Sequence, residues 1–172
     1  MAKSILLICG VAILAAFSAL ATQLKPLTIE QLIAAGETVV YGVVTSKTVQ
    51  RDADGRIVTR VQLTTKERWK GSKPVVSIVY AGGVLGDKAV FADGQEQYDI
   101  GEEVVTFVRF NTRGDAVTVG MSQGKFTVFE HNGETFVANG LHGASQSEVP
   151  KRGPQNALRL NELKARVSGG DR

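Results

Sequence analysis

The segment that decides the fold spans residues 38–70 and reads TVVYGVVTSKTVQRDADGRIVTRVQLTTKERWK. Its first part is rich in Val, Thr and Tyr, and its last part alternates between two kinds of side chain. A period of two is typical of half-buried β-strands. Between the parts, Asp52-Ala53-Asp54-Gly55 predicts a turn with positive φ angles at Asp54 and Gly55. The segment therefore predicts an antiparallel hairpin of two long strands.

The second strand has one mainly apolar face and one basic and polar face. The first face carries Ile57, Thr59, Val61, Leu63, Thr65 and Trp69, and the second carries Arg60, Gln62, Thr64, Lys66, Arg68 and Lys70. Such alternation is typical of a sheet with one face on the core and the other in solvent.

Further short strands follow at close spacing. They are expected at Val75–Tyr80, Val104–Phe110, Val117–Met121, Lys125–Glu130 and Thr135–Val137. No unit of 20 to 50 residues repeats, which excludes propellers and solenoids. We predict an all-β fold, β-rich with two short helices, in which an OB-fold-like antiparallel barrel of five to six strands removes the exposed sheet edges.

Two helices are expected outside the barrel strands. Thr28 followed by Gln31 makes a capping box, and Gly36 suits the position after a helix end. The apolar residues of this first helix share one face, so it is expected to lie on the core as a lid or plug. A second short helix is predicted near the C-terminus from the spacing of Leu158, Leu160, Leu163 and Val167.

The N-terminus has the pattern of an export signal. Lys3 precedes an apolar run of 16 residues, Ile5–Leu20, which ends in an Ala19-Leu20-Ala21 cleavage pattern. An uncleaved anchor is the alternative, but the run is shorter than the roughly 20 residues that a bilayer requires. We expect a signal peptide at 1–21, an OB-fold-like domain with its helix at 22–148, and a basic turn with the C-terminal helix and tail at 149–172.

Several stretches together resemble the netrin-like modules, a superfamily that includes the N-terminal domain of the tissue inhibitors of metalloproteinases. They are Val39–Val44, Glu67–Gly71, Val76–Ala81 and Tyr98–Val104. The resemblance covers about residues 37–130 and implies an OB-fold barrel in a secreted, bacterial protein of uncharacterised family. Those inhibitors chelate zinc through an N-terminal cysteine, whereas the lone Cys9 leaves with the signal. Their inhibitory residues therefore cannot be transferred to this chain.

Composition argues against metal, thiol and strongly electrostatic functions. After cleavage no cysteine remains, and His131 and His142 have no third ligand placed by spacing. Asp52 and Asp54 resemble the start of a calcium loop, but its last ligand would be Leu63, so a turn is the better interpretation. Removal of Lys3 leaves a net charge of +2, whereas nucleic-acid binders are usually strongly basic.

Two candidate sites remain. The first is the glycine-rich segment from Gly82 to Gly101, expected as one long loop in which Gly82, Gly83, Phe91 and Tyr98 form a binding surface. The second is an anion-binding face formed by Arg60, Lys66, Arg68 and Lys70, for which an ordinary solvated strand face is the favoured alternative.

The sequence predicts a periplasmic or secreted protein that acts by binding rather than by catalysis. The expected partner is a protein, with no nucleic acid, no cofactor, no metal, and membrane contact only through the signal segment before cleavage. A protease inhibitor or protease-associated module is the alternative that the resemblance suggests. A barrel that binds anions or oligosaccharides is a weaker one.

Overall fold

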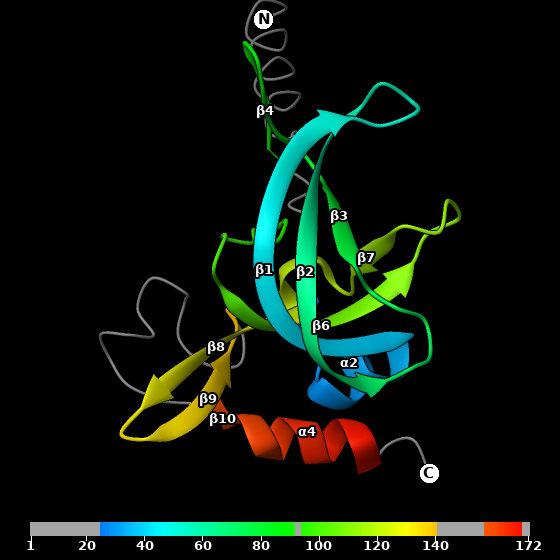
Figure 1. Ribbon diagram of the computed structural model, residues 1–172. Coiled ribbons are helices and arrows are strands. Elements are labelled where there is room, and N and C mark those ends of the chain that lie inside the picture. The colour runs from blue at the N-terminus through cyan, green and yellow to red at the C-terminus, as the bar shows by residue number, and fades with distance from the viewer. Residues whose placement is uncertain (1–24, 92–93, 141–156, 170–172) are drawn as a thin grey trace, which may run out of the picture.

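The computed structural model describes residues 25–91, 94–140 and 157–169, and its centre is a ring of five strands (Figure 1). The strands are β1 (Thr38–Arg51), β2 (Ile57–Lys70), β3 (Ser77–Ala81), β6 (Glu103–Phe110) and β7 (Ala116–Thr118). They pair in the order β1-β2-β3-β7-β6, and β6 pairs again with β1, which closes the ring. The expected all-β, OB-fold-like barrel is thus confirmed. One correction is that β3 and β7 pair in parallel, while the other pairs of the ring are antiparallel.

The β1–β2 hairpin forms the tall wall of the barrel. Its ladder runs from Val39 opposite Lys70 to Arg51 opposite Ile57, with three irregularities that bend it around the core. At the tip the Asp52 carboxylate accepts hydrogen bonds from the main-chain N–H groups of Asp54 and Arg56. These bonds confirm the turn. Gly55 alone has a positive φ there, because the Asp52 side chain supports the turn without a left-handed residue at Asp54.

The same strands face two separate apolar cores. Alternate residues of β1 and β6, including Val40, Val44, Val104 and Val108, point into the barrel. Their neighbours Val39, Val105 and Phe107 point outward into a second core. Because successive side chains alternate across a strand, a run of consecutive valines can serve both cores at once.

Helix α2 (Ile29–Ala35) lies on the outside of the barrel and does not plug it. Thr28 and Gln31 form the expected capping box, and Leu32 is fully buried in the second core beside Val39 and Phe107. Gly36 ends the helix in an extended conformation, and not in the left-handed one that its glycine suggested. A Cβ there would lie 3.1 Å from the Leu32 carbonyl oxygen, a tight contact that a side chain could keep only if its neighbours shifted slightly.

The second core is completed by the last part of the chain. A 3-10 helix, η1 (Met121–Gly124), leads into β8 (Lys125–His131), which pairs with β6 and with β9 (Glu134–Ala138). Strand β10 (Leu158–Arg159) and helix α4 (Leu160–Gly169) follow, and α4 buries Leu163 and Val167 against this core. Two strand expectations need correction: the chain leaves β7 at Thr118 and enters η1 at Met121, and Val75 and Val76 precede β3. The expected signal segment and the basic turn at Pro150–Pro154 lie outside the described residues.

Candidate binding site

The segment expected as one long loop contains a small hairpin. Strands β4 (Gly83–Leu85) and β5 (Lys88–Val90) pair with each other and rise beside the far end of the β1–β2 hairpin (Figure 1). The Gly86-Asp87 dipeptide between two short apolar runs is a hairpin signal that sequence reasoning missed.

Gly82 and Gly83 allow this hairpin to lie close to the barrel wall. Their φ angles are +91° and +132°, which side-chain-bearing residues rarely adopt. A Cβ on Gly82 would be 2.4 Å from the Val90 carbonyl oxygen, and one on Gly83 would be 2.7 Å from Thr59 Oγ1. The hydroxyl of Thr59 also donates to the Gly82 carbonyl at 2.7 Å. The glycines thus have an architectural role at the edge of a pocket.

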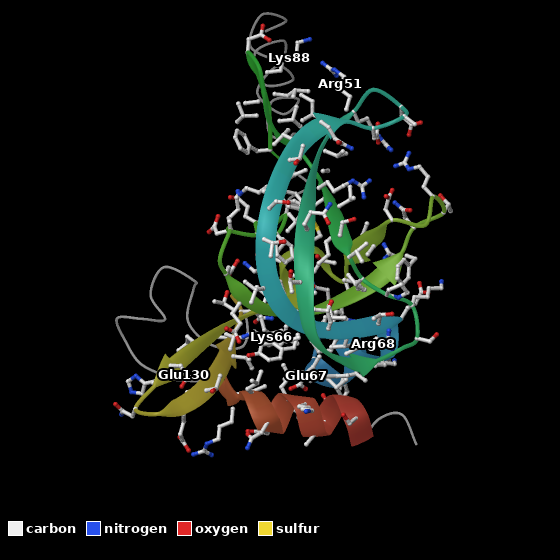
Figure 2. The ribbon with its side chains drawn as sticks, in the orientation of Figure 1. Arg51, Lys66, Glu67, Arg68, Lys88 and Glu130 are labelled. Carbon is white, nitrogen blue, oxygen red and sulfur yellow. The ribbon has the colours of Figure 1, made fainter. Side chains whose placement is uncertain are left out.

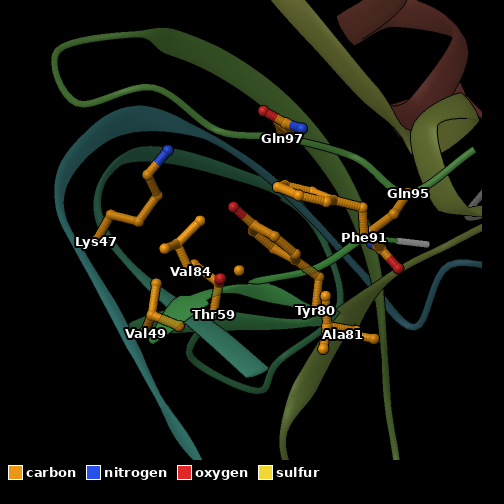
Figure 3. A pocket seen from close by; sticks show the side chains of 11 residues that line it. Lys47, Val49, Thr59, Tyr80, Ala81, Val84, Phe91, Gln95 and Gln97 are labelled. Carbon is orange, nitrogen blue, oxygen red and sulfur yellow. The ribbon is translucent and has the colours of Figure 1, made fainter. Parts of the chain in front are cut away.

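The hairpin and the barrel wall enclose a pocket of about 290 Å³ (Figure 3). It is lined by residues from β1, β2, the end of β3, the small hairpin and the segment that follows it: Lys47, Val49, Thr59, Tyr80, Ala81, Gly83, Val84, Val90, Phe91, Gln95 and Gln97. Of the candidate residues from the sequence, Gly83 and Phe91 line this pocket, while Gly82 lies next to it.

The pocket has apolar walls and a small number of polar groups. Phe91 is 72% exposed and Val84 is 58% exposed, which is unusual for such large apolar side chains. Figure 3 shows Tyr80 and Phe91 reaching in from one side and Lys47 from the other. Lys47 is the one charged side chain among the described lining residues. The polar groups can orient a ligand, and the apolar walls can remove its nonpolar surface from water.

Tyr80 links the pocket to the barrel interior. Its ring stacks on that of Tyr98, with centroids 6.2 Å apart. Burial raises the pKa of the Tyr80 hydroxyl above its ordinary value. At neutral pH the hydroxyl is therefore a neutral hydrogen-bonding group and not a charged one.

Tyr98 belongs to the barrel interior and not to an exposed binding surface. It has no exposed area, and its hydroxyl bonds to the hydroxyls of Thr106 (2.9 Å) and Thr118 (2.7 Å). Burial raises its pKa strongly. Tyr98 thus packs in the same core as Val104 and Val108, inside the barrel. Its place in a candidate binding loop is corrected accordingly.

The four basic residues of β2 are all engaged within the protein. Arg60 pairs with Asp115 at 3.0 Å and Lys66 with Glu103 at 2.6 Å. Arg68 donates to the Ser72 carbonyl and Lys70 to the Ile33 carbonyl. Figure 2 places Lys66 and Arg68 at the opposite end of the hairpin from Arg51. These contacts agree with a structural use of the stripe and reduce its capacity to bind an anion.

The described residues include no cluster of metal ligands at the pocket. No group of three or more His, Cys, Asp or Glu residues among them could hold a metal ion. The described lining residues include no carboxylate, histidine, cysteine or serine. What this arrangement can do is bind an apolar group and orient it.

Comparisons with known proteins add no family. No protein-family model matches the chain, and no curated protein matches it. In the part of the chain that the structure describes, no helix is both long and apolar enough to cross a membrane.

Proposed function

We propose that this is an exported, non-catalytic binding protein that captures a partner protein by taking one of the partner's apolar side chains into the pocket. The observation that carries the proposal is the exposure of Phe91 and Val84 around an apolar pocket that the fold has already formed. Exposed large apolar side chains at a concave site are typical of an interaction surface.

The size and polarity of the pocket favour a side chain of an extended segment. A volume of about 290 Å³ is just below the range of small-ligand pockets, which span about 300–1,000 Å³. Gln95 and Gln97 offer amide groups that can pair with a peptide main chain. The export pattern at the N-terminus and the resemblance to netrin-like modules support a partner in the periplasm or outside the cell.

In the first test, N-acetyl-phenylalanine amide is titrated as a probe into a protein of residues 22–172. Its binding is followed through the chemical shifts of the protein's main-chain amides in solution. We expect saturable shifts at Ala81, Gly83, Val84 and Val90, with amides of the β8–β9 hairpin unchanged. The absence of saturable shifts around the pocket at millimolar probe would contradict the proposal.

A matched pair of variants then separates the pocket from exposed apolar surface in general. Val84→Asp places a charge on the pocket wall, whereas Val76→Asp places one at a position that is 67% exposed and away from the pocket lining. We expect the first variant to lose probe binding at least tenfold and the second to bind as wild type.

The partner itself is sought by affinity capture from the exported fraction of the source cell. A protein retained by wild type and by Val76→Asp, but not by Val84→Asp, supports the proposal. If that protein is a protease whose activity falls on binding, the inhibitor alternative becomes the specific form of the function. If wild type, Val76→Asp and Val84→Asp all retain the same protein, the pocket is excluded as its binding site.

A further inference from the structure

Lys125 is a charged side chain fully enclosed by the protein. It is the first residue of β8, and its ammonium group lies 2.7 Å from Glu102 Oε2 and 3.2 Å from Glu96 Oε1. It also donates to the Gln97 carbonyl oxygen at 2.7 Å. The ammonium group therefore has two carboxylates and one main-chain carbonyl around it. The cost of burying the charge is offset only while the acceptors stay in place.

All three acceptors come from one short stretch, residues 96–102. The described chain from Gly94 to Glu102 contains neither helix nor strand, so it lacks the continuous ladder that fixes a strand. Lys125 holds this stretch from the β8 side. From the β1 side Lys47 donates to the Tyr98 carbonyl at 3.0 Å, and Gly101 donates to the Val44 carbonyl at 2.8 Å.

The stretch that Lys125 holds is also a wall of the pocket. Gln97 lines the pocket and gives its carbonyl oxygen to Lys125. The ammonium group of Lys125 lies 5.0 Å from the centre of the Tyr98 ring, and that ring stacks on Tyr80 of the pocket. A chain of direct contacts thus runs from the enclosed lysine to two pocket groups.

We infer that Lys125 is the positioning residue of the pocket: its charge draws Glu96 and Glu102 together and so fixes the wall that carries Gln97. This inference rests on the proposed function for its ligand, but the placement of the stretch can be tested without one. Without the cation, the buried Glu96 carboxylate and the half-buried Glu102 carboxylate would lose the positive charge between them, and their repulsion would move the wall outward.

The test compares Lys125→Met with Val137→Ala. Methionine keeps much of the length of lysine and removes its charge, while Val137→Ala removes buried volume from the second core on β9. We expect Lys125→Met to weaken binding of N-acetyl-phenylalanine amide at least tenfold and to speed hydrogen exchange of the Asp99, Gly101 and Glu102 amides. Val137→Ala, which also lowers thermal stability, should bind the probe within twofold of wild type.

Glu96→Gln is the milder variant that applies if Lys125→Met does not fold. It leaves the pair between Lys125 and Glu102 and should weaken probe binding about threefold. Unchanged probe affinity in whichever of the two variants is folded overturns the inference, whatever happens to stability. If the wild type itself does not bind the probe, the proposed function fails. Hydrogen exchange of residues 99–102 then decides alone whether Lys125 fixes the stretch.

Discussion

Asp115 shows how the basic face of β2 is neutralised residue by residue. Its carboxylate accepts from Arg60 at 3.0 Å, lies 4.0 Å from the Arg113 guanidinium, and accepts from Asn111 at 3.4 Å. The hydrogen bond from Arg60 is the largest of the effects that lower the pKa of Asp115 below its ordinary value of 3.8. A basic strand face in a sequence therefore need not be a free cationic surface.

The ion pair between Asp115 and Arg60 makes the stability of the fold depend on pH in a defined direction. A carboxylate whose pKa is lower in the folded state stabilises the fold at pH values above its unfolded pKa. That contribution disappears as the pH falls through the lowered pKa. We expect the difference in unfolding free energy between wild type and Asp115→Asn to be about 1 kcal/mol at pH 6 and to approach zero near pH 2. Urea unfolding at both pH values measures this difference in free energy, and Asp87→Asn serves as the control. The same difference between wild type and Asp115→Asn at pH 6 and pH 2 would contradict the prediction.

The Tyr98 hydroxyl is a second residue whose contribution can be isolated. Tyr98→Phe keeps the ring that stacks on Tyr80 and removes the oxygen shared by Thr106 and Thr118. Leaving enclosed hydroxyls without this partner should destabilise the protein by about 1–3 kcal/mol. Thermal unfolding compares it with Tyr80→Phe at the half-buried neighbour, for which we expect a smaller loss. Equal losses of stability in the two variants would contradict the larger contribution expected of the Tyr98 hydroxyl.

At the scale of elements, the β4–β5 hairpin depends on a backbone that only glycine readily adopts. Gly83 has a φ of +132°, and a Cβ there would lie 2.7 Å from both Thr59 Oγ1 and Val49 Cγ1. Gly86, at the tip of the same hairpin, has a φ of +62° with nothing within 4 Å of its Cβ position. Both positions have a positive φ, but only Gly83 is crowded by the barrel. Comparing a substitution at Gly83 with one at Gly86 therefore separates the effect of crowding from that of backbone conformation.

Gly83→Ala should destabilise the protein by about 1–3 kcal/mol and should weaken probe binding, because the new methyl group lies against two pocket residues. Gly86→Ala should bind the probe as wild type. Chemical denaturation and the amide-shift titration test both expectations. Equal probe affinity in the two variants would mean that the hairpin can move off the barrel without loss of the pocket.

Local patterns predicted the elements well where one face of a segment is apolar and the other polar. The alternation in β2, the capping box of Thr28 and Gln31, and the apolar spacing of Leu163 and Val167 each correspond to an observed element. The patterns could not predict the burial of Tyr98 and Lys125. That burial depends on partners far away in the fold, and no periodicity marks a polar residue for enclosure. The pocket was predictable only in part, because its lining comes from five strands and the segment that follows them, and its residues Tyr80 and Gln97 contact the enclosed Tyr98 and Lys125.

At the scale of the whole molecule, two cores share the same strands. Val39 and Val40 are neighbours in β1, yet the first packs under α2 and α4 and the second packs inside the barrel. The single tryptophan, Trp69, lies in the second core, the one outside the barrel. Its indole N–H donates to Glu67, and Glu67 pairs with Lys164 of α4 at 2.6 Å. Because both cores pack on β1 and β6, we expect the molecule to unfold as one unit.

Leu163→Ala, in helix α4, tests whether the whole molecule unfolds as one unit. The side chain is fully buried, so its truncation should cost about 2–5 kcal/mol. During unfolding in urea, Trp69 fluorescence reports on the second core, and far-ultraviolet circular dichroism reports mainly on the barrel strands. For the wild type and the variant alike, we expect both signals to change at one midpoint, shifted to lower urea in the variant. An earlier fluorescence transition in Leu163→Ala would mean that the outer layer separates first and that the barrel with its pocket stands without α4.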